Sequence, residues 1–286
     1  MKRTNACSPR SIISGGGRGT AGTCYTREQL LKIAQAYNNQ HSVSEHIQLT
    51  GSKEQLWRAI DSKMQNTCKA SDEYCWLEKL RISRDDMRDA FRPSGPAGQY
   101  EWLSTSQIRD VLVQYEKIYP DFVMLGPVPI DFCALTGNEV CNLNIRRSIA
   151  GGKRRIGIVF NTDPSTAPGR HWISMFIDMT DKNPTRWQID YFDSFGQAPL
   201  PAEILSLIEN LQAQNQGHFR LNLNCKLVPG GICTVSRRHQ YKNTECGVYS
   251  INFIVERLSG KSWEDIVIRE PKDDTTINNL RKSYFR

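Results

Sequence analysis

The chain has 286 residues, enough for one large domain or two modest ones, and its 39% apolar and 23% charged residues are typical of a globular protein with a real core. No apolar run approaches the roughly 20 residues that a membrane-spanning helix needs, and no apolar stretch follows the first residues, so we expect neither a membrane span nor a secretory signal. The net charge of +7 is spread thinly and indicates solubility. Weak attraction to nucleic acid is the alternative, but no zinc finger, phosphate-binding loop or RNA-recognition signature accompanies it.

The nine cysteines form an odd, irregularly spaced set. In a chain without a secretory signal, this pattern predicts reduced thiols in a cytosolic compartment rather than a disulfide framework. Cys68 and Cys75 have no zinc partner set around them and are expected to be structural. A second group of potential zinc ligands lacks the tight Cys-x₂₋₄-Cys pair of structural zinc sites, so we expect no metal and no cofactor. This group comprises Cys225, Cys233, His239 and Cys246.

Residues 1–24 carry Ser, Gly, Arg and Thr with few large apolar groups. They predict a flexible tail, because they cannot bury enough surface to offset the entropy of the chain. Residues 25–95 predict a helical arm domain, in which apolar residues recur every three or four positions and two Ser/Thr-x-x-Gln patterns form capping boxes. The expected helices follow Thr26 with Gln29 and Ser52 with Gln55, surround Trp76, and run from Asp85 to Phe91.

Residues 96–286 mix strand and helix patterns and predict an α+β domain with a mixed sheet flanked by helices. The Pro- and Gly-rich run 93–98 marks its boundary with the arm. The expected strands cover 156–161, 173–178, 188–192 and 219–224, and the expected helices cover 104–115, 201–214, the stretch from Cys246 to Val255 and the end of the chain from Thr276.

The most informative stretch runs from Arg238 to Ser250. Cys246 stands at the start of an apolar helix, where unpaired backbone N–H groups and the positive end of the helix dipole favour the nucleophilic thiolate. Gln240, six residues earlier, can donate a side-chain N–H to the same place and so help to hold an oxyanion. A buried, inert cysteine is the alternative for an isolated Cys, but the polar run before the helix favours the nucleophile.

A cysteine nucleophile needs a base and a group that orients the base. His171 begins one predicted strand and Asp193 ends the next, so antiparallel pairing of these strands would bring their side chains together. A hydrogen-bonded core histidine and a turn aspartate are the alternatives for the two residues taken alone. His218 and His239 are rival bases, but His239 lies only seven residues before Cys246 and the loop would have to fold back to bring it in.

In this order and spacing, the motifs resemble the superfamily of adenain and the ubiquitin-like-protein (SUMO) cysteine proteases. The residues of these motifs are most similar to those of one branch, the polyprotein-processing proteases of African swine fever virus and other large DNA viruses. The resemblance covers roughly residues 100–286, and it departs at Asp193, where the swine fever virus enzyme carries Asn. The segments that carry it are Trp102–Ile108, Asn161–Thr166, Gly169–Trp172, Ile177–Met179, Tyr191–Ser194, Arg238–Gln240 and Thr244–Gly247.

The resemblance implies a papain-like, adenain-like cysteine protease core that cleaves structural polyproteins after Gly-Gly during virion maturation. It implies a Cys246 nucleophile, a His171 base oriented by Asp193, and an oxyanion donor in Gln240, which agrees with the chemistry of these residues. It also implies a narrow channel, walled by two tryptophans, that excludes any β-carbon. The residues expected to contact the substrate are Trp102, Trp172, Asn161 and Glu245.

The same resemblance implies a partner and a place. The expected partner is a polyprotein with Gly-Gly-X sites, and Gly16 with Gly17 in the tail would be a self-processing site. The expected location is the host cytoplasm or the virus factory, with packaging in the virion as an extension.

Three other functions stay open at this point. The same site could act on host ubiquitin-like conjugates as a deSUMOylase or deubiquitinase. A related branch uses such a triad for acetyl transfer, which would require acetyl-CoA, although no clear phosphate-binding loop is present. A basic binding protein with a dead site is the last alternative, and the presence of all four catalytic residue types argues against it.

Overall fold

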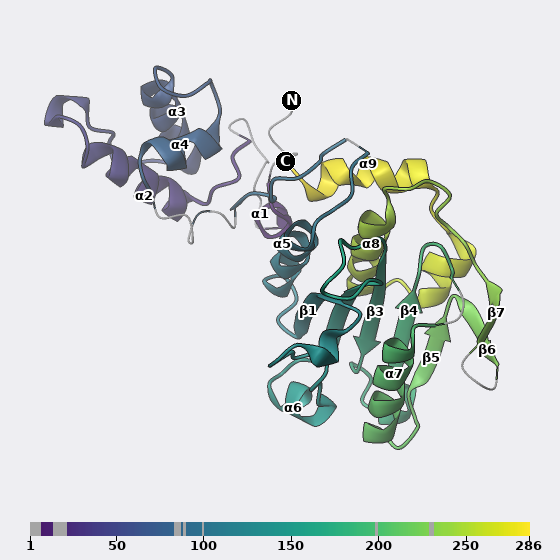
Figure 1. Ribbon diagram of the computed structural model, residues 1–286. Coiled ribbons are helices and arrows are strands. Elements are labelled where there is room, and N and C mark those ends of the chain that lie inside the picture. Colours follow the sequence, from purple (N-terminus) through teal and green to yellow (C-terminus); the bar gives the residue numbers. More distant parts are fainter. Residues whose placement is uncertain are drawn as a thin grey trace. The chain divides into compact units, whose positions relative to one another are not determined.

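The computed structural model describes residues 7–13, 22–82, 87, 90–98, 100–197, 200–228 and 232–286. The chain forms two compact units, an arm unit of Met1–Pro93 with Phe285–Arg286 and a core unit of Ser94–Tyr284. The described part of the arm is helical, and the core unit is built on a sheet (Figure 1). No helix in the described residues has both the length and the apolarity to cross a membrane. The Gly16-Gly17 pair and most of the helix expected from Asp85 to Phe91 lie outside these residues.

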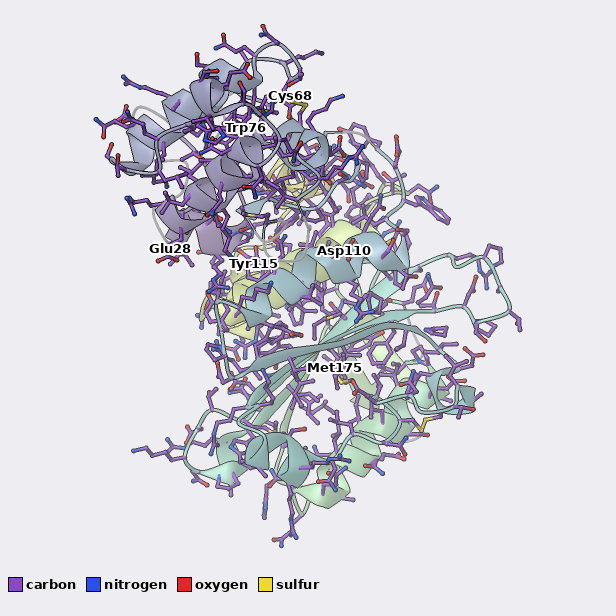
Figure 2. The ribbon with its side chains drawn as sticks, turned by 90° about the vertical axis from the view of Figure 1, so that its left-hand side faces the viewer. Glu28, Cys68, Trp76, Asp110, Tyr115 and Met175 are labelled. Atoms are coloured by element: carbon purple, nitrogen blue, oxygen red, sulfur yellow. A yellow bond between two sulfur atoms is a disulfide. The ribbon has the colours of Figure 1, made fainter. Side chains whose placement is uncertain are left out.

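Side-chain caps explain where the arm helices begin. Thr26 and Ser52 each accept a hydrogen bond from the backbone N–H three residues on, and the Gln at that position reaches back, so both predicted capping boxes are confirmed. The apolar faces of these helices share one core, with the fully buried Trp76 among its largest side chains (Figure 2). The arm helices are α1 Pro9–Ile13, α2 Arg27–Asn38, η2 Val43–Glu45, α3 Lys53–Met64 and α4 Glu73–Lys79.

Three disulfides correct the prediction of reduced thiols. Six cysteines pair, with Cα atoms 5.0 to 5.9 Å apart, which is within the range that a disulfide spans. The prediction was wrong because linear spacing does not show which cysteines the fold brings together. Among the cysteines whose side chains the structure describes, Cys246 alone is free. The pairs are Cys7–Cys24, Cys68–Cys75 and Cys133–Cys141.

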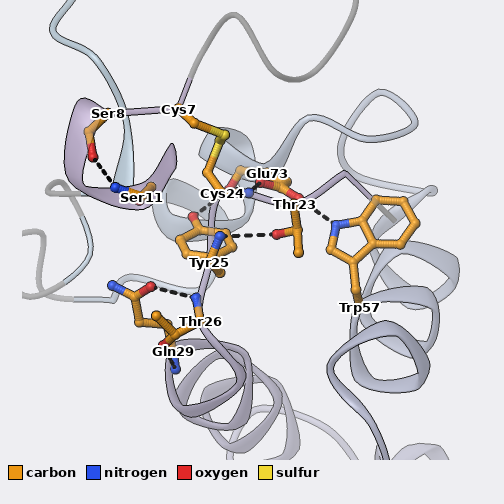
Figure 3. The surroundings of a disulfide bond; sticks show 10 residues. All are labelled: Cys7, Ser8, Ser11, Thr23, Cys24, Tyr25, Thr26, Gln29, Trp57 and Glu73. Atoms are coloured by element: carbon orange, nitrogen blue, oxygen red, sulfur yellow. Dashed lines mark hydrogen bonds between the residues drawn. A yellow bond between two sulfur atoms is a disulfide. The ribbon is translucent and has the colours of Figure 1, made fainter. Parts of the chain in front are cut away.

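The first of these disulfides also corrects the predicted tail (Figure 3). Cys7 and Cys24 are both buried, and Cys7 forms a β-bridge with Phe91. The buried Glu73 carboxylate accepts hydrogen bonds from the Cys24 backbone N–H and from the indole N–H of Trp57. The described part of residues 1–24 is therefore packed into the arm, and the prediction of a flexible tail is wrong there.

The core unit is built on a five-stranded mixed sheet, so the predicted α+β class is confirmed. The strand order is β1-β2-β3-β4-β5, in which the three central strands pair antiparallel and each outer pair is parallel. A separate hairpin pairs β6 with β7. The strands are β1 Phe122–Pro129, β2 Arg155–Asn161, β3 Trp172–Asp178, β4 Gln188–Phe192, β5 Arg220–Leu223, β6 Cys225–Val228 and β7 Ile232–Ser236.

Helices cover both faces of the sheet (Figure 2). Alternate residues of β3, such as Met175, join one apolar cluster with α6 and α7. On the other face, Phe176 stacks with Phe122, and α5 and α8 pack against the strands. The helices are α5 Thr105–Glu116, α6 Ile145–Ala150, α7 Ala202–Gln214, α8 Cys246–Leu258 and α9 Asp274–Tyr284, with short turns at η4 Phe132–Ala134, η5 Pro184–Arg186 and η6 Asp265–Arg269.

Helix α8 is buried almost all round, as expected of a helix that is apolar on every side. It packs on β3 and lies beside α5 and α9. Near its C-terminal end, the buried Arg257 pairs with Asp190 on β4 and Asp178 on β3. The first residue of α8, Cys246, is therefore placed by a helix that is anchored to the sheet.

Candidate active site

The pairing of β3 with β4 brings His171 and Asp193 together. His171 precedes β3 and Asp193 follows β4, and Ser174 lies opposite Phe192 in this antiparallel pair. The start of one strand therefore lies beside the end of the other. His171 Nε2 is 2.6 Å from Asp193 Oδ1, and both side chains are buried. The positions of the two residues on the predicted strands indicated this contact.

Backbone groups hold the Asp193 carboxylate in place. Its Oδ1 accepts the Phe195 N–H and its Oδ2 accepts the Gln197 N–H, both at 2.9 Å. The Asn224 side chain accepts the Asp193 N–H at 3.1 Å and donates to the Asp193 carbonyl. Asn224 follows β5, which runs parallel to β4, so both strands end at the same edge. Sequence analysis missed Asn224, and parallel pairing of the last two expected strands was the signal that would have found it.

His171 is held in a protonated state. The Phe195 ring stacks on its imidazole with centroids 4.5 Å apart. Burial lowers the pKa of His171, but the hydrogen bond to Asp193 and the neighbouring Cys246 thiol outweigh burial and raise the pKa to about 9. With Nε2 engaged by Asp193, the buried Nδ1 has no hydrogen-bond partner among the described groups. Nδ1 is therefore the atom that can exchange a proton with the Cys246 thiol.

The raised pKa predicts how His171 titrates. Its pKa of about 9 in the folded protein exceeds the ordinary 6.5, so the positive charge stabilises the fold fully below pH 6.5, and this contribution is lost as the pH rises through about 9. An NMR titration of the His171 ring should show a midpoint near 9 in the parent chain. In Asp193→Asn the carboxylate charge is gone, so the midpoint should move to lower pH. Equal midpoints in the two proteins would show that Asp193 does not set the charge of His171.

Cys246 carries a free thiol at the start of α8, 3% exposed. The first N–H groups of a helix have no acceptor within the helix, and the helix dipole is positive at that end. Both effects favour a thiolate, and they also favour an oxyanion that forms beside it. The position is therefore suited to a nucleophile.

Gln240 is fully buried and tied to the residue that follows Asp193. Its Oε1 accepts the Ser194 hydroxyl at 2.7 Å, and its backbone N–H donates to the Ser194 carbonyl at 2.8 Å. Its Nε2 donates to the Lys242 carbonyl at 2.8 Å, and the other Nε2 hydrogen has no partner in the described part of the chain. These bonds fix the orientation of the amide and leave one N–H for an oxyanion.

A groove of about 580 Å³ lies in the core unit, and its lining includes Trp172 but not His171 or Cys246. Trp102, 47% exposed, and the buried Trp172 both line it, as does Asn161. The indole N–H of Trp172 donates to the Leu103 carbonyl at 3.0 Å, and Leu103 also packs against Gly247. Trp172 directly follows His171, and the lining residue Leu103 contacts Gly247, so the groove adjoins the segments that carry His171 and Cys246. Three of the four residues expected to contact a substrate therefore line one groove.

The remaining candidates lie elsewhere. Glu245 is fully buried, its carboxylate accepts the backbone N–H and the hydroxyl of Thr244, and it does not line the groove, so its contact with a substrate stays a prediction. His239 packs edge-on against Phe192, and burial lowers its pKa. His218 is exposed and lines a different cavity. Within the described residues, no three His, Cys, Asp or Glu side chains gather as metal ligands would.

The close packing of Gly247 against Leu103 predicts that a larger residue at position 247 would disturb the site. A β-carbon there would lie 3.0 Å from Leu103 Cβ and 3.2 Å from its Cδ1. In Gly247→Ala, Leu103 and the Trp172 indole bonded to it should shift, at a cost of about 1–3 kcal/mol in unfolding free energy. Thermal unfolding and the alkylation rate of Cys246 measure both consequences. Adding Leu103→Ala makes room and should restore part of the loss, whereas a double variant no better than Gly247→Ala would exclude this contact as the cause.

The fold and the site define a class of protein. A free cysteine at the N-terminus of α8, a histidine held by a carboxylate at the ends of β3 and β4, and a buried amide in the loop before α8 belong to one unit, which also contains a groove. Nucleophile, base, orienting group and oxyanion donor are the parts of a cysteine protease site, and this class is recognised by geometry rather than by sequence position.

Comparison with known proteins identifies the family, although no family model matches the chain. The chain is 29% identical over 289 residues to a thiol protease of Acanthamoeba polyphaga mimivirus, over 92% of this chain and 89% of that protein. It is 33% identical over 232 residues to the SUMO-1 cysteine protease of African swine fever virus, over 77% of this chain and 80% of that relative. Its fold is similar to the crystal structure of the African swine fever virus protease, with a TM-score of 0.67 at 18% identity over 100% of this chain and 97% of that one. The chain belongs to this family of cysteine proteases, and the predicted enzyme class is confirmed.

Proposed function

We propose that the protein is an endopeptidase that cleaves structural polyproteins after Gly-Gly during virion maturation. The observation that carries the proposal is the groove lined by Trp102 and Trp172, which adjoins the segments that carry His171 and Cys246. Two glycines before the scissile bond would present no β-carbon to the aromatic walls, and their backbone could approach closely. The enzyme would thus select substrates whose two residues before the scissile bond have no β-carbon.

In the proposed reaction, His171 and Cys246 form a standing ion pair. The thiol proton resides on His171 Nδ1, while Asp193 holds the opposite ring nitrogen and stabilises the imidazolium. The Cys246 thiolate attacks the carbonyl carbon of the second glycine. The resulting oxyanion accepts hydrogen bonds from the free N–H of Gln240 and the backbone N–H of Cys246, each worth about 3 kcal/mol in comparable acyl-transfer sites.

In the steps that follow, His171 first gives up its proton and then takes one from water. The intermediate collapses when His171 Nδ1 gives its proton to the departing amine, which leaves a thioester between the glycine and Cys246. Water then attacks the thioester while Nδ1 takes its proton. The glycine carboxylate leaves, the thiolate is regenerated, and the proton on His171 restores the ion pair.

Peptide cleavage tests this function. A fluorogenic peptide with Gly-Gly before the reporter amide should be cleaved, and replacing either glycine with alanine should lower kcat/KM about 10- to 100-fold, since a crowded methyl group costs about 1–3 kcal/mol. The parent chain is compared with Cys246→Ala in every assay. Equal turnover of the glycine and alanine peptides would refute selection by the channel, and no turnover of any peptide by folded enzyme would refute the endopeptidase role.

A folded ubiquitin-like modifier is the second candidate substrate. The swine fever virus relative carries the name SUMO-1 cysteine protease, and the same groove would suit the Gly-Gly tail of a modifier. The proposal predicts that peptides are cleaved while intact SUMO and ubiquitin conjugates are not. Cleavage of a conjugate at a rate similar to that of the peptide would move the function to deconjugation of host proteins.

We further propose that the enzyme works in the host cytoplasm or the virus factory and is packaged in the virion. The three disulfides support packaging, because thiols stay reduced in the cytosol and a disulfide-bonded mature enzyme is more compatible with the virion. Non-reducing gels of purified particles and of infected-cell cytosol test this location. An enzyme found only in the cytosol and fully reduced would contradict it.

A further inference from the structure

The buried face of the last helix, α9, carries polar and charged residues. Helix α9 packs beside α8, and its buried residues recur at positions i, i+3, i+4, i+7 and i+10, which share one helix face. Such a face is ordinarily apolar, but three of the residues on it are polar or charged. These three are Asp274, Asn278 and Arg281.

The carboxylate at the start of α9 binds the loop that carries the oxyanion donor. Asp274 Oδ2 accepts the backbone N–H groups of Tyr241 and Lys242 at 2.8 and 2.9 Å. Its Oδ1 accepts the hydroxyl of Tyr249 on α8 at 3.3 Å. The Lys242 carbonyl in turn accepts the side-chain N–H of Gln240. The Gln240 amide is therefore oriented by the carbonyl of Lys242, the same residue whose backbone N–H binds to Asp274.

The guanidinium two turns later binds the other end of the same loop. Arg281 has no exposed surface, its Nη2 donates to the Thr244 carbonyl at 2.8 Å, and its Nε donates to Asn278 Oδ1 at 2.8 Å. Its Nη1 is buried and has no hydrogen-bond partner among the described groups. A buried cation with an unused donor is costly unless nearby negative charge offsets it, so its neighbours should include an anion.

We propose that α9 braces the nucleophile loop, residues 240–245, and that Asp274 and Arg281 are positioning residues for the reaction. The proposal rests on the roles proposed above for Gln240 and Cys246. Asp274 holds the backbone N–H of Lys242, whose carbonyl orients the Gln240 amide, and Arg281 holds the Thr244 carbonyl, two residues before Cys246.

The charges around Arg281 come from three parts of the core unit. Burial lowers the pKa of Arg281, and the negative charge of Glu245 is the largest influence that opposes burial, followed by that of Cys246. Glu101 and Tyr100, in the segment before α5, face it as well. Cys246 thus interacts electrostatically with Arg281 on α9 and with His171 before β3.

The test uses the full chain and separates the two residues by what each should change. Asp274→Asn keeps the size of the side chain but removes an acceptor from the loop, so kcat on the Gly-Gly peptide should fall about 10-fold with KM within about twofold, as expected when an oxyanion donor is misplaced. Arg281→Met removes both the charge and the bond to the Thr244 carbonyl, so alkylation of Cys246 by iodoacetamide should slow about 10-fold. Arg281→Lys keeps the charge and should restore most of that rate.

The matched control is Arg155→Met. Arg155 is a partly buried arginine paired with Asp121 and distant from the site in the fold, at the start of β2, so both readouts should stay at parent values. Alkylation needs no peptide, so it still reports on Arg281 if the Gly-Gly specificity is wrong. If Arg281→Met does not fold, Arg281→Lys and Asp274→Asn decide through kcat. Folded Asp274 and Arg281 variants with parent kcat and parent alkylation rates would overturn the proposal, as would a change confined to KM.

Discussion

Replacing Cys246 with alanine is expected to abolish peptide cleavage, with a fall in kcat of about 10⁶-fold, the size seen when the nucleophile of a coupled catalytic unit is removed. No other free thiol is described in the core unit, and in the proposed reaction His171 and Gln240 act on groups that arise only after Cys246 has attacked the carbonyl carbon. The fold should survive, because alanine suits the start of a helix interior and the lost sulfur leaves a small cavity, worth about 1 kcal/mol.

Two measurements make this prediction decisive. Circular dichroism and thermal unfolding should show that Cys246→Ala is folded, with a stability close to that of the parent chain. The same NMR titration that follows His171 should then show a lower midpoint, because the neighbouring Cys246 contributes to the raised pKa. Cleavage above about 1% of the parent rate by the folded variant would contradict the assignment of the nucleophile.

Replacing Arg257 with methionine is expected to lower the free energy of unfolding by about 3–5 kcal/mol, the cost of leaving a buried charge without its partner. Arg257 Nε lies 2.6 Å from Asp190 Oδ2, and both side chains are buried. The guanidinium also bonds to Asp178 and to the Lys261 carbonyl. Burial already raises the pKa of Asp190, so without the arginine this carboxyl must either take up a proton or remain charged and unpaired.

Denaturant unfolding of four variants isolates that effect: the two single changes Arg257→Met and Asp190→Asn, their double variant, and Arg220→Met. Asp190→Asn combined with Arg257→Met removes both charges, so the double variant should lose less stability than the sum of the two single changes. Arg220→Met breaks an exposed pair with Glu264 and should cost about 1 kcal/mol or less. If Arg257→Met were as mild as Arg220→Met, the buried pair would not be what anchors α8 to the sheet.

The parts of the site that sequence analysis predicted are those whose signal is local. The capping boxes at Thr26 and Ser52 lie within four residues, and the helix that begins at Cys246 is marked by its own apolar run. The meeting of His171 with Asp193 followed from one assumption, that two successive strands pair antiparallel. The last helix begins at Asp274, two residues before its expected start at Thr276, because the helix boundary lies in the polar run that precedes its periodic part.

The parts that were missed depend on contacts between distant segments. Asn224 meets Asp193 across 31 residues, and Arg281 meets Thr244 across 37. A buried asparagine or arginine looks like a surface residue until the fold supplies its partner. The Cys7–Cys24 disulfide was not predicted for the same reason, because the Gly- and Ser-rich composition between the two cysteines gave no sign that they pair.

The most direct measurement of the central claim is covalent capture of the nucleophile. The full chain is incubated with a peptide that ends in Gly-Gly bearing a thiol-reactive electrophile in place of the scissile amide, and the adduct is located by mass spectrometry. We predict one adduct per chain, on Cys246, formed much more slowly by His171→Ala and by a probe with Ala in place of the last Gly. An adduct on Cys225 or Cys233 instead, or equal labelling by the Gly and Ala probes, would contradict the account.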